Sequence, residues 1–375
     1  MMNQTHTLYA ITHSLFSGRA RAYLIKQGIP FVERSTGHES FKAEVLPKAK
    51  VPTIPTLVTP DGAVVRDGAE IIAHFEDATG NPCQPPGLQQ RFLSALFDVI
   101  GPEGLLRPAM HFRWNFQADN LHFERYHFYH SQRDHPARDD KTDNMMGRMQ
   151  QVARIWGVNE ESIPLVEALY MELLAALNAH FEQQPYLFGW RPSIGDFGML
   201  APLYAHLGRD PYPARLMQQN AVSVYRWVER MNRADQDAPE FYNAGDDFLE
   251  DDQIPETLCA VLRVLAQDFL AETQASAGAI NGWIDENGAK AGDNAPRMAG
   301  TCTFDVREQT ITSAAQPYRF YGLQKCHAIY DAADETDRAE LDALMTRCDL
   351  GGLMDHRLAW KVVFEDNQET WQAHG

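Results

Sequence analysis

The sequence predicts an α/β domain at residues 1–80, an all-α domain at residues 88–240 and a mixed extension at residues 241–375. Three observations support this division. Short strand patterns alternate with two helical patterns in the first 80 residues. Helical periodicity then dominates from Leu88 to about Met231. Beyond the acidic run at 246–252, helical and strand-like segments are mixed.

Composition and charge exclude several classes of protein. Apolar residues make up 44% of the chain, which is ordinary for a globular protein, and the formal net charge is -18. Such an acidic surface repels phosphate backbones and anionic lipids, so we expect no nucleic-acid partner and no membrane association. No apolar run is long enough to span a bilayer, and the N-terminus lacks a signal pattern. The 5 cysteines are widely spaced with no CxxC pair, which favours reduced thiols in a cytoplasmic protein.

Two prolines interrupt the strand-like stretch from Lys50 to Val58. Because proline lacks the N–H that a central strand needs, Pro55 is expected to open a strand after a cis Ile54–Pro55 bond. That arrangement leaves the N–H and C=O of Ile54 facing outward, where an extended peptide ligand can pair with them. The alternative is an ordinary proline-rich loop before an edge strand.

The neighbouring segments favour the first interpretation. We expect strands at 7–11, 31–33 and 63–66, a helix from Gly18 to Gln27 ended by Gly28, an Asp61-Gly62 turn, and a helix after Asp67 that carries Ile71, Ile72 and Phe75. The resulting order is strand, helix, strand, strand, strand, helix. This is the order of thioredoxin-like domains.

At this point the chain resembles the glutathione transferase superfamily, in three places. Residues 14–21 are similar to the family's active-site loop and first helix. Residues 51–57, with the helix start after Asp67, are similar to its cis-proline strand. Residues 189–197 are similar to the capping box in its second domain. The resemblance implies the glutathione transferase fold, a thioredoxin-like domain packed on an all-α domain, and a homodimer; no family is recognised in the C-terminal extension.

The expected helices of the second domain are 89–100, 103–130, 162–181, 193–207 and 221–231. Ser193 and Asp196 fit a capping box of structural importance. In the extension we expect helices at 258–270, 319–330 and 336–347, a loop at 287–300, and strands at 301–306 and near 360–364. The acidic run before it is interpreted as a solvated boundary.

Ser14 and Ser17 precede the first helix, whose first turn carries N–H groups without intrahelical partners and a partial positive charge. Such a terminus stabilises an anion and lowers the pKa of a thiol. The loop contains no cysteine, so a thiolate there would come from the ligand. Alternatively the serines only cap the helix, which we expect of Ser17. The resemblance selects Ser14, five residues before Arg19, as the catalytic serine; Tyr9 is the second candidate, and His13 is expected at the surface.

The resemblance implies glutathione as co-substrate. It assigns the binding of glutathione to Ile54, Pro55, Asp67, Gly68 and Lys50, with Lys48 as an alternative to Lys50. The backbone N–H of Gly68 suits the γ-glutamyl carboxylate. The serine hydroxyl that the family usually carries at this position is missing, and the lysines could alternatively be ordinary solvated side chains.

The resemblance also places a pocket for a small apolar electrophile along an aromatic segment. The predicted members are Phe16, Phe112, Arg113, Trp114 and Tyr126. Aromatic residues at helical spacing can instead form core. The histidines between 111 and 135 lack a clean i, i+4 spacing with carboxylates, so we predict no metal.

The sequence therefore predicts a glutathione transferase-like enzyme that holds glutathione as a thiolate for attack on an apolar electrophile. The rival hypothesis is a non-catalytic protein of the same fold that binds a partner through its cleft or its extension. A glutathione-using isomerase or dehalogenase is the third hypothesis, which the sequence does not separate from the first.

Overall fold

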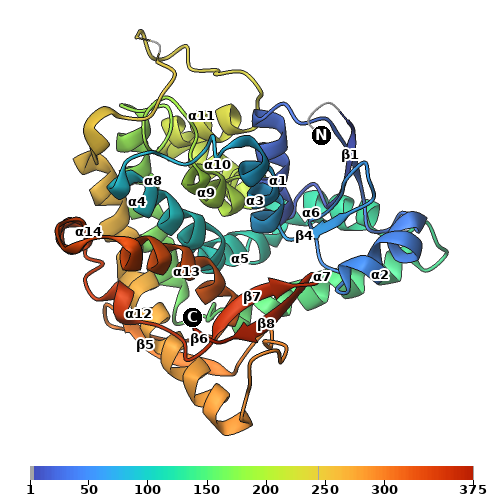
Figure 1. Cartoon of the computed structure of the whole chain (residues 1–375). Helices are drawn as coiled ribbons and strands as arrows, with labels where there is room; N and C mark the ends of the chain where they lie inside the picture. The colour runs from blue at the N-terminus through green and yellow to red at the C-terminus, as the bar shows by residue number, and fades with distance from the viewer. Residues whose placement is uncertain (1–3, 244, 375) are drawn as a thin grey trace.

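A four-stranded mixed sheet forms the N-terminal domain in the computed structural model, which describes residues 4–243 and 245–374. Its strands β1 (His6–Tyr9), β2 (Phe31–Arg34), β3 (Thr56–Val58) and β4 (Val64–Arg66) lie in the order β2-β1-β3-β4. β1 is parallel to β2 and antiparallel to β3, which is antiparallel to β4. The helices of this domain are α1 (Leu15–Lys26), the short α2 (Leu46–Ala49) and α3 (Gly68–Thr79). The predicted thioredoxin-like order is confirmed (Figure 1).

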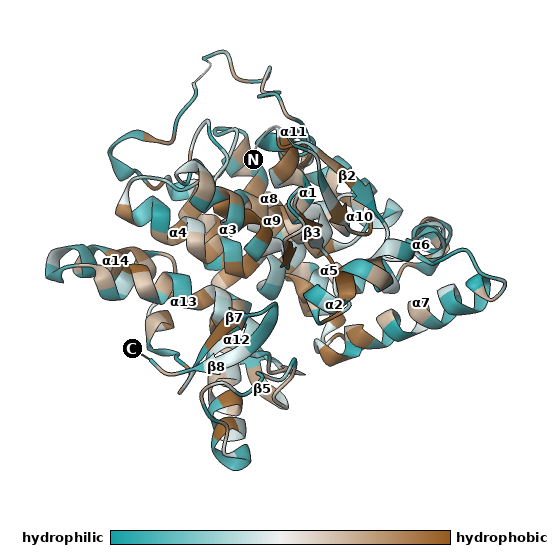
Figure 2. Cartoon of the chain, turned by 45° about the vertical axis from the view of Figure 1, so that its right-hand side comes forward, coloured by the Kyte–Doolittle hydropathy of each residue, from teal (hydrophilic) through white to brown (hydrophobic). Residues whose placement is uncertain are grey.

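The helical part follows with eight helices among the described residues. They are α4 (Leu88–Val99), α5 (Leu106–Trp114), α6 (Gln117–Ser131), α7 (Arg138–Ile155), α8 (Ile163–Phe181), α9 (Ile194–Ala205), α10 (Pro211–Asn220) and α11 (Val222–Met231). The single helix expected at 103–130 is wrong: the chain leaves helical geometry at Phe116 (ψ 53°), which separates α5 from α6. Figure 2 shows α7, which we did not predict, projecting from the molecule with mixed hydrophilic and hydrophobic residues. α10 was not predicted either; Pro211 occupies its first turn, where proline is tolerated.

The C-terminal extension combines three helices with two hairpins. Its elements are α12 (Glu256–Asn287), β5 (Thr301–Val306), β6 (Gln309–Ala314), α13 (Pro317–Ala332), α14 (Glu335–Arg347), β7 (Lys361–Glu365) and β8 (Gln368–Gln372). α12 continues 17 residues past the expected end at 270, with Ile280 and Ile284 buried along it. The partner strands β6 and β8 were not predicted. The division of the chain into three domains stays a prediction.

One hydrophobic core runs through all three parts of the chain. Leu24 of α1, Phe97 of α4 and Leu262 of α12 belong to the same cluster of buried residues. The extension is therefore packed into the molecule rather than attached at its surface. Asp252 of the acidic run also has a structural role, because its carboxylate accepts hydrogen bonds from Gln89 N–H at 2.7 Å and Gln90 N–H at 2.9 Å at the start of α4. The interpretation of this run as a mere solvated boundary is corrected accordingly.

None of the helices in the described part of the chain combines the length and the apolar character needed to cross a membrane.

Ser193 and Asp196 form the predicted capping box at the start of α9. Asp196 Oδ2 accepts hydrogen bonds from the N–H and the hydroxyl of Ser193, both at 2.8 Å. Asp196 Oδ1 accepts from Leu187 N–H and Trp227 Nε1–H, both at 3.1 Å. Burial raises the pKa of Asp196, and these hydrogen bonds oppose the shift. One buried carboxylate thus ties α9 to α11 and to the chain before it.

Arg113 of α5 lies in a buried group of charged side chains. Its Nε and Nη2 donate to Asp210 at 2.7 and 2.8 Å, and its Nε is 3.4 Å from Glu124 Oε1. Glu124 of α6 is 1% exposed, and neither of its oxygens accepts a hydrogen bond from a described residue. Burial raises the pKa of Glu124 well above its ordinary range; Arg113 opposes this shift and Asp210 adds to it. Burial therefore favours the protonated form of Glu124, beside the ion pair of Arg113 and Asp210.

We expect Asp196→Ala to lower the free energy of unfolding by about 3–5 kcal/mol, because it leaves the buried donors of Ser193, Leu187 and Trp227 without an acceptor. Ser193→Ala removes only the cap and should cost about 1 kcal/mol. Asp334→Ala, at the exposed cap of α14, is the matched control and should also cost about 1 kcal/mol. Urea unfolding followed by tryptophan fluorescence measures all three; equal losses from Asp196→Ala and Asp334→Ala would contradict the prediction.

Glu124 should make stability depend on pH. In the unfolded chain a glutamic acid loses its proton above pH about 4.3, whereas the folded protein keeps the proton on Glu124. The unfolded state then binds fewer protons, so the free energy of unfolding falls as the pH rises. We expect Glu124→Gln to gain stability relative to the unaltered protein between pH 5 and pH 8 in urea unfolding. The exposed Glu160→Gln is the control; a difference for Glu124→Gln that does not change with pH would refute this.

Candidate active site

Three segments of the N-terminal domain meet at Gly68: the start of α1, the Ile54–Pro55 bond and the start of α3. The Ile54–Pro55 peptide is cis, as predicted. A Cβ atom placed on Gly68 would lie 3.0 Å from the carbonyl oxygen of Phe16 and 3.8 Å from Pro55 Cγ. A larger residue at this position would push against the backbone of α1. The close approach gives a physical reason for glycine where the family usually has serine.

Ser14 is the N-cap of α1. Its backbone is extended (φ −80°, ψ 130°), and its Oγ accepts a hydrogen bond from Ser17 N–H at 3.4 Å. Ser17 is fully buried, and its own Oγ accepts from Ile11 N–H at 3.4 Å. We expected Ser17 to be the capping serine, but the cap is Ser14, and α1 begins at Leu15 rather than Gly18. The half-buried Ser14 hydroxyl lies at the helix N-terminus, where the helix dipole favours an anion.

Side chains of α5 and α6 contact the loop before Ser14. Both terminal nitrogens of Arg113 donate to the carbonyl of His13 at 3.2 Å. Thr12 Oγ1 and His127 Nδ1 are 2.8 Å apart. The ring of His13 packs on Phe128 and His127, with ring centres 4.6 and 5.0 Å away.

Our expectation that His13 is a surface residue is wrong. The residue is 2% exposed, and burial lowers the pKa of His13 well below its ordinary value. The helix that covers it begins more than 100 residues later in the chain, so no local pattern indicated its burial. Tyr9, the second candidate for catalysis, is also buried, and its hydroxyl lies 2.6 Å from Ser40 Oγ.

The backbone of Ile54 has no hydrogen-bond partner. Neither its N–H nor its C=O bonds to another group within residues 4–243 and 245–374. β3 begins two residues later and pairs with β1 and β4. Ile54 therefore offers one donor and one acceptor beside the start of α1.

Asp67 is the N-cap residue of α3, and its backbone has a positive φ (φ 88°, ψ 145°). Its Oδ1 accepts from Ala69 N–H and from the hydroxyl of Tyr318 in α13, both at 2.8 Å. The N–H of Gly68 donates to no described acceptor. Tyr318 lies 251 positions from Asp67, and no sequence motif pointed to it.

The turn of the β7–β8 hairpin covers the outer edge of β4. Asn367 Oδ1 accepts from Arg66 N–H at 3.1 Å, and its Nδ2 donates to the carbonyls of Lys48 and Val64 at 3.2 Å. Asp366 and Asn367 both have positive φ, 48° and 62°, as tight hairpin turns require.

Both lysines predicted for the glycyl carboxylate have partners in this structure. Lys50 Nζ lies 3.2 Å from Asp366 Oδ2, and Lys48 Nζ donates to the carbonyl of Gly62 at 2.7 Å. The Lys50 and Asp366 side chains are 40% and 73% exposed. Such an exposed ion pair contributes only about 0–1 kcal/mol, so an incoming carboxylate can compete for Lys50.

Three of the five members predicted for the electrophile pocket are buried in the interior: Phe112, Arg113 and Trp114. Phe112 and Trp114 belong to two different clusters of buried residues, and Arg113 directs its donors to Asp210, His206 and the backbone. Phe16 is half-buried and Tyr126 is 58% exposed, so these two have exposed surface. An electrophile pocket at these residues stays a prediction.

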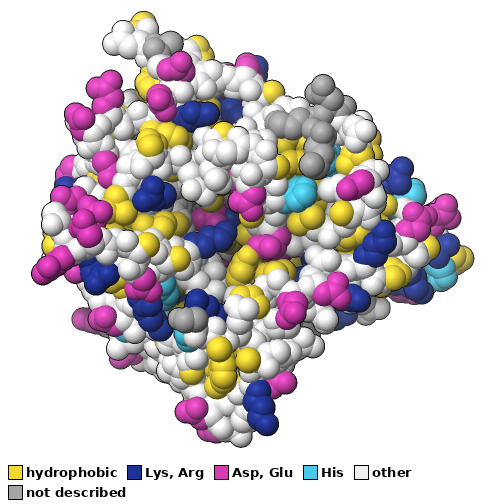
Figure 3. All heavy atoms as spheres, in the orientation of Figure 1, with side chains coloured by type: hydrophobic (Ala, Val, Ile, Leu, Met, Phe, Trp, Pro, Cys, Tyr) yellow, Lys and Arg dark blue, Asp and Glu magenta, His cyan; other side chains and the backbone are white. Residues whose placement is uncertain are grey.

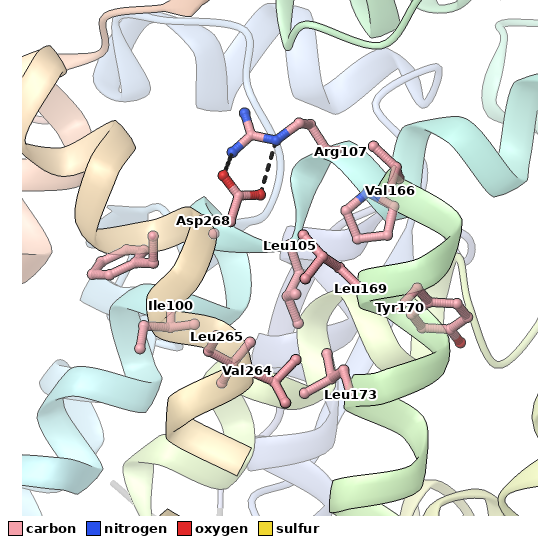
Figure 4. A pocket seen from close by; sticks show the side chains of 13 residues that line it. Ile100, Leu105, Arg107, Val166, Leu169, Tyr170, Leu173, Val264, Leu265 and Asp268 are labelled. Carbon is pink, nitrogen blue, oxygen red and sulfur yellow. Dashed lines mark hydrogen bonds and ion pairs between the residues drawn. The ribbon is translucent and has the colours of Figure 1, made fainter. Parts of the chain in front are cut away.

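Figure 4 shows a small apolar cavity between α5, α8 and α12, bounded by the ion pair of Arg107 and Asp268. Its volume is about 30 Å³, room for a single water molecule. An electrophile does not fit there. Within the described residues, no three His, Cys, Asp or Glu side chains are grouped to hold a metal ion.

Residues 8–83 match the family model of the glutathione S-transferase N-terminal domain. No curated protein sequence matches the chain. Solved structures similar to it include a glutathione S-transferase from Xanthobacter autotrophicus, at 21% identity and TM-score 0.34, covering 60% of this chain and 91% of that one. One from Methylobacterium radiotolerans, in complex with glutathione sulfonate, has 17% identity and TM-score 0.37 and covers 66% and 100%. One from Phanerochaete chrysosporium has 14% identity and TM-score 0.44 and covers 62% and 98%.

At TM-scores below 0.5 these likenesses add nothing to what the family match shows. The match itself coincides with the sheet, the cis-proline and the start of α3 described above. By this match, residues 8–83 belong to the family of glutathione S-transferase N-terminal domains.

Proposed function

We propose that this protein is a glutathione transferase-like enzyme that holds glutathione as a thiolate for attack on an apolar electrophile. The observation that carries the proposal is the unpaired backbone of Ile54 next to the start of α1 and its N-cap Ser14. A peptide thiol paired with Ile54 would bring its sulfur to the Ser14 hydroxyl. The N-terminus of α1 adds the field that favours the ionised sulfur.

In this mechanism the protein supplies a thiolate and a position for it rather than a proton relay. The Ser14 hydroxyl donates to the sulfur, Ile54 pairs with the cysteinyl backbone, and the N–H of Gly68 meets the γ-glutamyl carboxylate. Phe16 and Tyr126 are proposed to contact the electrophile because they keep exposed apolar surface. Conjugation, isomerisation and dehalogenation would all use this arrangement.

A non-catalytic binding protein of the same fold is the second candidate. It is favoured by the contacts of the extension with Asp67 and Lys50, two of the residues proposed to bind glutathione. Calorimetric titration separates the two candidates, because the enzyme requires measurable binding at millimolar glutathione. A cytoplasmic homodimer is part of the proposal, supported by the family's habit and by the five free cysteines, all buried.

Ser14→Ala should weaken the ionisation of bound glutathione. Losing a hydrogen bond to a charged sulfur costs about 1.5–3 kcal/mol, so we expect kcat/KM with an activated aryl halide to fall about 10- to 150-fold. The ultraviolet absorbance of the bound thiolate should fall with it. Asp334→Ala also removes a helix cap, far from the proposed site, and should leave both readouts unchanged. Unaltered thiolate absorbance in Ser14→Ala would remove Ser14 from the mechanism.

Asp366→Asn should strengthen glutathione binding, because it releases Lys50 for the glycyl carboxylate and removes a negative charge beside it. An exposed pair of this kind is worth up to about 1 kcal/mol, so we expect Kd to fall about two- to fivefold at low salt, and less at high salt. The neighbouring Glu365→Gln removes an equal charge that has no ion-pair partner among the described residues, and should have a smaller effect. Equal effects of the two changes would show that Lys50 does not bind this carboxylate.

A further inference from the structure

We propose that Tyr318, supplied by the C-terminal extension, positions glutathione: its phenol oxygen and the carboxylate of Asp67 together bind the γ-glutamyl ammonium group. The inference rests on the proposed function and adds a residue to its site. It also assigns the extension a part in ligand recognition.

The hydrogen bond between these two side chains leaves acceptors for a ligand. The Tyr318 hydroxyl donates to Asp67 Oδ1 at 2.8 Å, so lone pairs of the phenol oxygen stay available. Asp67 Oδ2 accepts no hydrogen bond from a described residue. An ammonium group has three donors and no acceptor, and it matches two neighbouring oxygens of which one belongs to a carboxylate.

The adjacent residue provides the complementary group. The N–H of Gly68 has no described acceptor and lies at the start of α3, where a carboxylate is favoured. The γ-glutamyl end of glutathione carries an ammonium and a carboxylate on the same carbon atom. The two charges of an α-amino acid therefore each find a partner: Asp67 and Tyr318 match the ammonium group, and the N–H of Gly68 matches the carboxylate.

Tyr318 brings a hydroxyl to the start of α3, where position 68 has none. A side chain at Gly68 would press against the carbonyl of Phe16, as its Cβ would lie 3.0 Å from that oxygen. The hydroxyl comes from helix α13 and donates to Asp67, the N-cap of α3. Burial raises the pKa of Tyr318 well above its ordinary value, and Asp67 adds to the shift, so the phenol stays protonated.

The Tyr318 ring packs against two other aromatic rings. The Tyr318 ring centre lies 5.7 Å from that of Tyr321 and 6.2 Å from that of Phe364 in β7. The next residue, Arg319, is buried and pairs with Glu272 of α12. In Figure 3, basic and acidic side chains gather in the hollow near the centre of the view, where α3, α13 and β7 approach one another. Tyr318 is thus a rigid part of this junction, as a positioning residue must be.

If Tyr318 instead blocked the start of α3, removing its hydroxyl would lower the Kd of glutathione rather than raise it. One experiment decides between the two roles. Calorimetry measures the Kd of glutathione and of its analogue without the α-amino group (glutaryl-cysteinyl-glycine) for the unaltered protein and for Tyr318→Phe. We expect the Kd of glutathione to rise about five- to tenfold in Tyr318→Phe and the Kd of the analogue to stay unchanged. Tyr321→Phe, which loses a similar bond to Glu70, is the matched control and should bind both ligands normally.

Three results would overturn the inference. Equal or tighter glutathione binding by Tyr318→Phe would mean that the phenol is not used or that it blocks the site. An equal loss for both ligands would mean that the ring only supports the packing. If the unaltered protein binds neither ligand, the proposed function itself fails. Asp67→Asn, which keeps an oxygen for Ala69 N–H, serves as the second variant if Tyr318→Phe does not fold, and should likewise weaken glutathione alone.

Discussion

The close approach at Gly68 is the constraint on which the rest of the site depends. Because no side chain stands there, the start of α3 comes within contact distance of the Phe16 carbonyl and of Pro55. The start of α1, the cis-proline segment and the start of α3 are thereby brought to one point. The same closeness means that a side chain on residue 68 would press on the Phe16 carbonyl, and the hydroxyl found at this point comes from Tyr318 of the extension.

The extension supplies that hydroxyl because it shares the core of the molecule. α12 packs its buried face against α8 and β5, and α13 lies on α4, so Tyr318 reaches Asp67 from a rigid support. The β7–β8 turn makes a different kind of contact. Its Asp366 pairs with Lys50 at the surface, where water and ligands compete for both charges. The extension thus meets the proposed glutathione site through one part-buried contact and one exposed contact, with different consequences for binding.

Buried charge has a comparable role behind Ser14. Arg113 was expected in a substrate pocket, but it holds the carbonyl of His13 and pairs with Asp210 inside the protein. A guanidinium that is fully enclosed needs all of its donors satisfied, which leaves none for a ligand. The aromatic neighbours Phe112 and Trp114 are likewise enclosed, each within a cluster of buried residues.

The sequence by itself determined the features that depend on neighbours along the chain. Patterns within about ten residues indicated each strand and helix of the first domain, and so their order along the chain. Similar local patterns indicated the cis-proline segment, the helix start at Asp67 and the Ser193–Asp196 capping box. Only the tertiary structure decided the burial of His13, the enclosure of Arg113 and the contact of Tyr318 with Asp67. These depend on which surfaces pack together across separations of 92 to 251 residues, and side-chain patterns in a single sequence do not encode that pairing locally.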